Sequence, residues 1–116
     1  GGGRDKWKRP EMGRIAAKYA DGVIVTYDDP YQEPPGKIIE DVYKGVQRAK
    51  GNVQSFKIAE RKEAIKTALR MAKKDDIVLI AGKGSETVME TAAGKIPWNE
   101  REIVREILGN LLREIT

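Results

Sequence analysis

The sequence predicts one α/β domain with a mostly parallel sheet and helices on both of its faces. Its 116 residues are enough for one ordinary domain and too few for two. Helical and strand-like segments alternate along the chain, and the strand-like segments are short and apolar on both faces. Such alternation calls for parallel strands joined by right-handed crossovers, and these place helices on both sides of the sheet.

Apolar residues recur at helical spacing in four segments. The expected helices cover residues 10–20, 38–46, 64–72 and 99–115. Pro10 suits a first helical turn, and Asn99 with Glu102 three positions later has the pattern of an N-cap. Lys73 and Lys74 lie at the end of the third helix, where the helix dipole favours cations.

Three segments have the composition of strands. They are residues 23–26, 53–58 and 76–81, and the last is the most strand-like part of the chain. Three prolines exclude regular structure from residues 27–35, and a glycine-rich loop is expected before Asn99. The glycines at positions 1–3 stand where a strand-to-helix loop belongs, yet no strand precedes them. We therefore expect the first strand to be missing from this chain and one sheet edge to be left unpaired or filled from elsewhere.

The composition excludes several kinds of chemistry. With no cysteine and no histidine, the chain has no disulfides, thiol nucleophiles, zinc clusters or histidine-based acid–base catalysis. The net charge is +4, and the first 14 residues carry +3 of it. The longest apolar run spans residues 77–81, far short of the roughly 18 residues of a membrane helix, and no signal peptide is visible. We expect a cytoplasmic protein that does not enter membranes.

Three loops are candidates for a binding site, because ligands of open α/β sheets bind at the carboxyl ends of the strands. They are residues 1–10, 27–31 and 82–86. Each also has a simpler explanation. Glycines such as Gly82 are often required by the backbone conformation of a loop rather than by a ligand. The glycines of residues 82–86 do not have the spacing of a P-loop. Asp-Pro pairs commonly begin turns, and a basic run is often a solvated face.

The combination of motifs is more specific than its parts. The chain contains Gly-Gly-x-Arg-Asp-Lys-x-Lys-Arg-Pro, Val-Ile-Val-Thr-x-Asp-x-Pro, Val-Leu-Ile-Ala-Gly-Lys-Gly-x-Glu-Thr and Lys-Ile-Pro-Trp-Asn-Glu-Arg-Glu, in that order. This series resembles the C-terminal domain of the Mur ligases over nearly all 116 residues. It is most similar to members that add the third residue, a diamino acid, to UDP-N-acetylmuramoyl-L-alanyl-D-glutamate in peptidoglycan synthesis.

The resemblance implies a fold and a division of labour. Residues 1–116 would be a Rossmann-like three-layer domain that binds the amino acid, without the N-terminal UDP-sugar domain and the central ATP-binding domain. In this family, ATP converts the substrate carboxylate to an acyl phosphate, which the amine then attacks. ATP and Mg²⁺ would be bound mainly by the absent central domain. The isolated chain is then expected to hold no catalytic or metal-binding residue and to be inactive alone, and the whole enzyme to be a monomer.

The resemblance also assigns residues to the amino-acid site. Arg4 would bind a carboxylate of the incoming amino acid, because a guanidinium can hold a carboxylate with two hydrogen bonds. A four-residue selectivity motif matches Asp28, Asp29, Pro30 and Tyr31, and the far end of the substrate would contact Gly82 and Glu86.

Four positions depart from the family pattern. Tyr31 replaces the arginine that holds the second carboxylate of diaminopimelate, and Asp29 replaces asparagine. A pocket with these residues and Glu86 should attract an ammonium group and repel a distal carboxylate, which predicts lysine or ornithine as the added amino acid. Gly3 and Ser85 stand where the family usually has aspartate and histidine, and these differences indicate either a divergent subfamily with an altered pocket or a homologue with another acceptor.

Two other classes of function are alternatives. The basic segment around Trp7 would suit a stand-alone nucleotide- or nucleic-acid-binding module. However, the charge of +4 is modest, and Asp5 and Glu11 interrupt the cations. The other alternative is a non-enzymatic protein-interaction domain. The ligase reading is preferred, with the UDP-N-acetylmuramoyl dipeptide and a diamino acid as partners and no nucleic acid.

Overall fold

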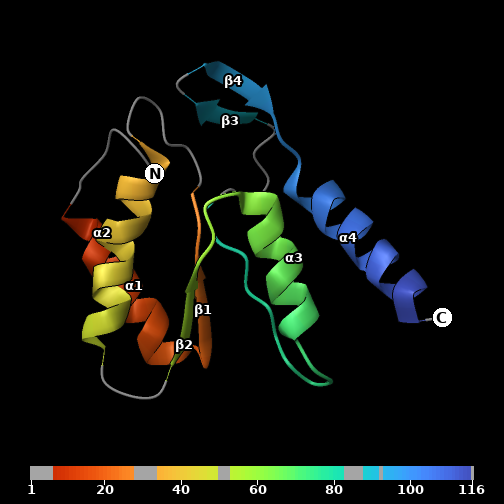
Figure 1. Cartoon of the computed structure of the whole chain (residues 1–116), viewed down its shortest axis with the longest axis horizontal. Helices are drawn as coiled ribbons and strands as arrows, with labels where there is room; N and C mark the ends of the chain where they lie inside the picture. Colours follow the sequence, from red (N-terminus) through yellow and green to blue (C-terminus); the bar gives the residue numbers. More distant parts are fainter. Residues whose placement is uncertain (1–6, 28–33, 50–52, 83–87, 92, 116) are drawn as a thin grey trace.

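The computed structural model of the chain describes residues 7–27, 34–49, 53–82, 88–91 and 93–115. It is a small mixed α/β domain with a short parallel sheet at its centre. Helices α1 and α2 lie on one side of this sheet, and α3 lies on the other (Figure 1). The helix α4 lies beyond α3, and a two-stranded hairpin lies at the top of the view. Helices on both sides of a parallel sheet are what the sequence predicts.

The central sheet has two strands in the described part of the chain. Strand β1 (Gly22–Val25) pairs in parallel with β2 (Gln54–Lys57), in a register that sets Val23 opposite Ser55 and Val25 opposite Lys57. The crossover between them contains α2, as expected for parallel strands. Both strands lie within the segments predicted from the sequence. The sheet is smaller than predicted, because the other edge of β1 has no partner among the described residues.

Helices α1 (Lys8–Tyr19) and α2 (Pro35–Arg48) pack on this sheet and on each other. Both confirm a predicted helix, and α2 begins at a proline, whose missing amide hydrogen is harmless in a first turn. Apolar side chains from both helices and from β1 form the main core cluster: Ala17, Val25, Ile39 and Val46.

Two glycines allow the backbones of α1 and α2 to touch. A Cβ atom on Gly45 would lie 1.7 Å from the carbonyl oxygen of Pro10, and one on Gly13 would lie 2.0 Å from the carbonyl oxygen of Val42. Because no side chain can shift to relieve a contact with backbone atoms, only glycine fits at either position. The pair of helices is therefore fixed at its closest possible approach.

Helices α3 (Arg61–Met71) and α4 (Glu100–Ile115) confirm the two remaining predicted helices. The carboxylate of Glu60 caps α3 by accepting hydrogen bonds from the backbone N–H groups of Lys62 (3.1 Å) and Glu63 (2.8 Å). The predicted cap of α4 is also present, with the N–H of Glu102 donating to Asn99 Oδ1 at 3.1 Å.

The prediction for residues 76–81 is wrong, because the structure has no strand there. The exposed and half-buried side chains alternate as in a strand, with Ile77 and Leu79 exposed and Val78 and Ile80 half-buried. A strand, however, needs a neighbour for its N–H and C=O groups. No described segment supplies one, so this strand-like sequence stays unpaired.

The expected glycine-rich loop before Asn99 contains a hairpin that the sequence did not predict. Strands β3 (Val88–Thr91) and β4 (Gly94–Pro97) pair antiparallel, with Val88 opposite Pro97 and Thr91 opposite Gly94. The mostly parallel character of the sheet therefore holds for β1 and β2 only.

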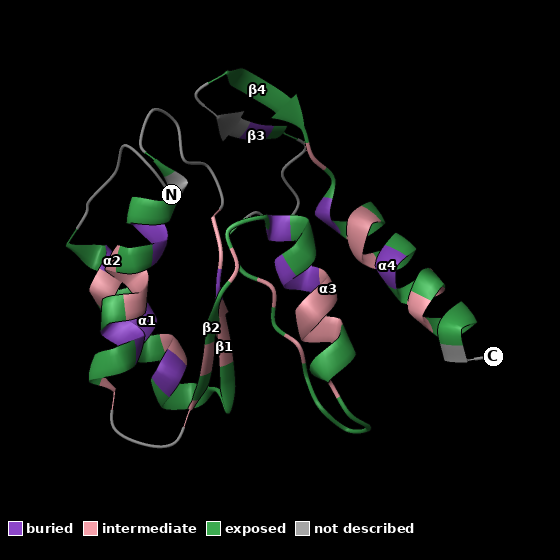
Figure 2. Cartoon of the chain, in the orientation of Figure 1, coloured by how far each residue is buried: buried purple, intermediate pink, exposed green. Residues whose placement is uncertain are grey.

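Buried residues are distributed unevenly over the domain (Figure 2). Purple positions gather where α1 and α2 meet and at the start of α3, while much of α4 and all of β4 are exposed. In the described part of the chain, no helix has the length and apolar character needed to span a membrane.

Candidate functional site

A buried arginine lies where three segments meet on the α3 side of the sheet. Arg61 is the first residue of α3 and is 3% exposed. Its Nη1 donates to the backbone carbonyl of Tyr27 (3.3 Å), just beyond the end of β1, and its Nη2 donates to the carbonyl of Ala81 (2.8 Å). The predicted loops 27–31 and 82–86 begin at or directly after these two residues. One guanidinium thus holds the starting points of both loops.

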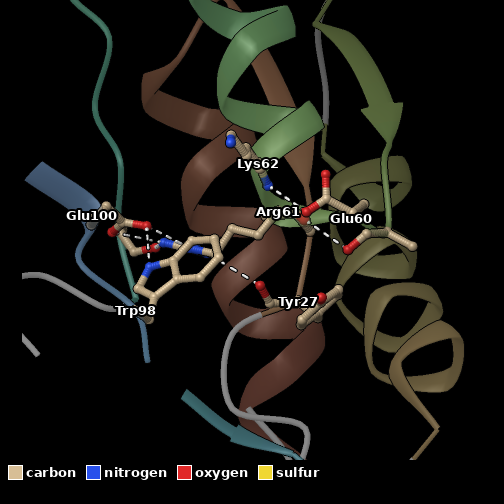
Figure 3. A network of polar contacts seen from close by, with 9 residues as sticks. Tyr27, Glu60, Arg61, Lys62, Trp98 and Glu100 are labelled. Atoms are coloured by element: carbon tan, nitrogen blue, oxygen red, sulfur yellow. Dashed lines mark hydrogen bonds and ion pairs between the residues drawn. The ribbon is translucent and has the colours of Figure 1, made fainter. Parts of the chain in front are cut away.

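The opposite side of this guanidinium is occupied by a carboxylate. Glu100, the first residue of α4, accepts from Arg61 Nε at 2.7 Å and from Nη2 at 3.0 Å. Trp98 Nε1 donates to the same carboxylate at 3.4 Å, and Figure 3 shows its indole beside the pair. Both charged side chains are almost fully buried. A carboxylate that accepts two hydrogen bonds from one guanidinium fixes the orientation of the guanidinium plane and also balances its positive charge.

Local sequence explains why Arg61 stands at this point. Glu60 caps the helix, so the next residue begins α3 beside the sheet edge. Thr26 Oγ1 also donates to the carbonyl of Ala59 at 3.1 Å, which ties the segment before α3 to the end of β1. The start of α3 is thereby held against the carboxyl end of β1 from two directions.

The predicted site residues fall mostly outside the described part of the chain. These are Arg4, Asp28, Asp29, Pro30, Tyr31 and Glu86, together with the departures Gly3 and Ser85. Gly82 is described, and its φ of +111° is a backbone conformation that side-chain-bearing residues rarely adopt. The structure therefore supports a conformational reason for glycine at position 82.

Part of the basic charge near the N-terminus is engaged in ion pairs. Arg9 is buried, and its Nη1 lies 3.0 Å from Asp41 Oδ2 on α2. Arg14 pairs with Glu11 one turn earlier on α1, and this hydrogen bond to Arg14 lowers the pKa of Glu11. The same contact raises the pKa of Arg14. Because Arg9 and Arg14 are already paired with carboxylates, they are less suited to binding an external anion than the basic sequence of this segment suggests.

A depression of about 330 Å³ lies over this segment. It is lined by Trp7, Pro10, Glu11, Arg14, Gly45 and Arg48. Trp7 is 71% exposed, and Lys8 Nζ lies 5.5 Å from the centre of its ring. The Glu11 carboxylate at this surface disfavours a phosphate ligand.

Across residues 7–27, 34–49, 53–82, 88–91 and 93–115, no three acidic side chains gather as metal ligands would. The sequence also has no P-loop.

Comparison with known proteins decides the family. The sequence profile of the family described as "Mur ligase, glutamate ligase domain" matches residues 1–84. The chain belongs to this Mur ligase family. The match runs from the predicted Arg4 loop, through β1, α2, β2 and α3, to the loop after Gly82.

Relatives of known name agree with this assignment. The chain is 49% identical, over 93% of its length, to the UDP-N-acetylmuramoyl-L-alanyl-D-glutamate--2,6-diaminopimelate ligase of Caldanaerobacter subterraneus. It is 45% identical over 94% of its length to the ligase of the same name from Aquifex aeolicus, and 45% over 92% to that of Bacteroides thetaiotaomicron. The Mur ligase chain described here spans 22% of the length of each.

Arg61 was not predicted from the sequence, and Glu100 was noted only as part of a motif. The predicted helix began at residue 64, so the sequence did not show that Arg61 is the first residue of α3, where an arginine opposes the helix dipole. Such a placement indicates a specific partner. Glu100, which lies 39 positions away in the chain, provides it.

Proposed function

We propose that this chain is the C-terminal, amino-acid-binding domain of a longer ATP-dependent ligase. The enzyme would add the third residue to UDP-N-acetylmuramoyl-L-alanyl-D-glutamate through an acyl phosphate, in the cytoplasm and as a monomer. Membership of the Mur ligase family and relatives named for this reaction support the proposal. ATP and Mg²⁺ would be bound mainly outside this chain, by the central domain that the family resemblance implies.

The observation that carries the proposal is the meeting of two loops at one buried side chain. The backbone carbonyl oxygens of Tyr27 and Ala81 both accept hydrogen bonds from the Arg61 guanidinium. The family resemblance assigns four amino-acid-binding residues, 28–31, to the loop that follows Tyr27. It assigns two more, Gly82 and Glu86, to the loop that follows Ala81. Residues separated by about fifty positions in the sequence can then act on one small substrate.

The unpaired edge of the sheet supports the idea of a larger enzyme. Strand β1 has a partner on one side only in the described chain, and residues 76–81 are strand-like but unpaired, with Ile77 94% exposed. One additional parallel strand between them would satisfy both segments. We propose that a strand from elsewhere in the longer ligase takes this place.

The amino acid is proposed to be lysine or ornithine. Tyr31 has no positive charge to hold the second carboxylate of diaminopimelate, while Asp28, Asp29 and Glu86 offer carboxylates to an ammonium group. The named relatives use diaminopimelate, which makes this amino acid the alternative. A charged group left without its partner in a closed site usually costs orders of magnitude in selectivity.

An assay of phosphate release tests both parts of this proposal. The full-length enzyme, or a chimera in which this chain replaces the matching segment of the Caldanaerobacter ligase, is supplied with ATP, the UDP-linked dipeptide and one amino acid. Release that depends on an amino acid supports the ligase function, and its absence contradicts it. A higher kcat/KM for lysine or ornithine than for diaminopimelate supports the proposed substrate.

A substitution at position 31 sharpens the test of substrate choice. Tyr31→Arg restores the missing guanidinium and should raise kcat/KM for diaminopimelate relative to lysine by about tenfold or more. Tyr31→Phe is the matched control, because it keeps the ring and adds no charge. Equal effects of the two substitutions would contradict the proposed role of this position.

A further inference from the structure

Arg61 occupies a position that helix energetics disfavour. It carries a positive charge at the N-terminus of α3, where the helix dipole is positive, and it is 3% exposed. A buried ion pair generally stabilises a fold no better than apolar residues of the same size would. The Arg61–Glu100 pair is therefore poorly explained as a device for stability alone.

The geometry of the guanidinium shows what else it does. Glu100 holds one edge, and the remaining N–H groups donate to the carbonyls of Tyr27 and Ala81. These acceptors belong to segments that are not paired as strands with each other in the described chain. Because the planar fork of an arginine has fixed angles between its donors, it sets the spacing of the two carbonyls.

We propose that Arg61 is a positioning residue of the amino-acid site, which sets the separation and direction of the loops that start at Tyr27 and Gly82. This inference rests on the proposed function, because it concerns the substrate for which those loops are assigned. Arg61 itself need not touch the amino acid. It acts through the backbone from which Asp28–Tyr31 and Glu86 extend, and a displacement of either loop changes how well the site fits its substrate.

A second arginine of α3 provides a matched control. Arg70 also pairs with a glutamate of α4, Glu114, with its Nη2 3.1 Å from Oε1. Both of these side chains are about half exposed, and the pair lies at the opposite end of the two helices. Arg61 and Arg70 thus both connect α3 to α4, but only Arg61 also binds the two loop carbonyls.

The experiment compares Arg61→Lys with Arg70→Lys in the phosphate-release assay described above, using the full-length ligase or the chimera. Lysine keeps the positive charge but lacks the planar fork. We expect Arg61→Lys to raise the KM for the amino acid about tenfold or more while the KM for ATP stays within about twofold. Arg70→Lys should leave both values unchanged.

The split between the two KM values separates positioning from a merely structural role. Partial unfolding lowers the amount of active enzyme, and so kcat, but it leaves both KM values where they were. An amino-acid KM that is unchanged by Arg61→Lys in a folded, active enzyme would overturn the inference. Parallel increases in both KM values would also overturn it.

Glu100→Gln provides a second test of the positioning role if the Arg61→Lys variant does not fold. This variant keeps the guanidinium and its two carbonyl bonds, so the amino-acid KM should stay within about threefold of the wild-type value while the melting temperature falls. A tenfold rise in the amino-acid KM would mean that the α3–α4 pair, rather than the carbonyl contacts, controls the site. That result would overturn the inference.

A measurement without catalysis distinguishes failure of this inference from failure of the proposed function. In NMR spectra of the chain itself, the amide signals of residues 28 and 82 report on the carbonyls of Tyr27 and Ala81, with which they share peptide groups. Arg61→Lys should shift both signals, and Arg70→Lys should shift neither. Unchanged signals would overturn the inference even if the wild-type enzyme proved not to be a ligase.

Discussion

The half of the domain that contains α1 and α2 is more closely packed than the half that contains α3 and α4. On one side of the sheet, α1 and α2 touch at their backbones, and apolar side chains such as Ile39 are almost fully buried. In the other half, Leu79 is 86% exposed, Leu112 on α4 is 63% exposed, and α4 contacts α3 alone among the described helices and strands. The first half therefore contains the closest packing, although α1 also exposes apolar side chains such as Tyr19 at 78%. The exposed apolar surface of the second half is suited to burial in a larger protein.

The largest effect is expected where the first half is packed most closely. Gly45→Val places a side chain against the backbone of Pro10 and should destabilise the isolated chain by about 4 kcal/mol or more. Denaturant unfolding followed by circular dichroism measures this change. Gly109→Ala in α4 is the control. Open space surrounds this position, and alanine there should raise stability by about 0.5–1 kcal/mol. A tolerated Gly45→Val would contradict the backbone contact between α1 and α2.

The next largest effect contrasts two aliphatic residues from opposite halves. Ile39→Ala removes a side chain that is 3% exposed and should reduce the free energy of unfolding by about 3 kcal/mol. Leu112→Ala, at 63% exposure, should reduce it by less than about 0.5 kcal/mol. Equal losses in urea titrations would show that α4 is as well packed in solution as the helices on the sheet.

A smaller effect is expected at the unpaired strand-like segment. The double substitution Ile77→Lys and Leu79→Lys should change the stability of the isolated chain by less than about 1 kcal/mol, since both side chains are already exposed. In the longer ligase, the same change should lower the melting temperature by several degrees if a strand packs there. Differential scanning calorimetry of both proteins makes the comparison. An equal loss in both would contradict a missing neighbour.

The smallest effect concerns an exposed ion pair in the first half. The hydrogen bond from Arg14 lowers the pKa of Glu11, so the folded state favours the ionised carboxylate. The contribution of this ion pair to the stability of the fold is present at neutral pH. It is lost as the pH falls through the pKa of Glu11 in the folded state, which lies below the ordinary glutamate value. Glu11→Gln should therefore lower the melting temperature slightly at pH 7 and not at pH 2.5. Glu106→Gln on the exposed side of α4 should change it at neither pH.

The sequence was sufficient to predict the elements that depend on local patterns. All four helices follow apolar periodicity, and the cap at Asn99 follows from residues three positions apart. Strands β1 and β2 were also predicted, because β-branched or alternating residues are bounded there by loop signals. The failure at residues 76–81 has a physical reason, since strand pairing depends on a neighbour that local sequence does not reveal.

The hairpin and the centre of the site were harder to predict. Strands β3 and β4 have little alternation of apolar and polar residues, and their register depends on a short turn after Thr91. Arg61 was overlooked because its meaning depends on Tyr27, Ala81 and Glu100, all at least twenty positions away. Gly82 was assigned through the family motif, and its φ of +111° in the structure adds a conformational reason for glycine at this position. The loop residues assigned by family resemblance stay predictions.

The contacts of Arg61 have a consequence for how this family can diversify. Ala81 and Glu100 bind the same guanidinium, so the whole stretch between them, including the β3–β4 hairpin, is a loop with both ends anchored at one point. The entropy of closing such a loop changes only slowly with its length. Insertions and deletions could therefore accumulate in the stretch without moving its ends. Evolution can in this way change the length of this stretch while the rest of the domain keeps its architecture.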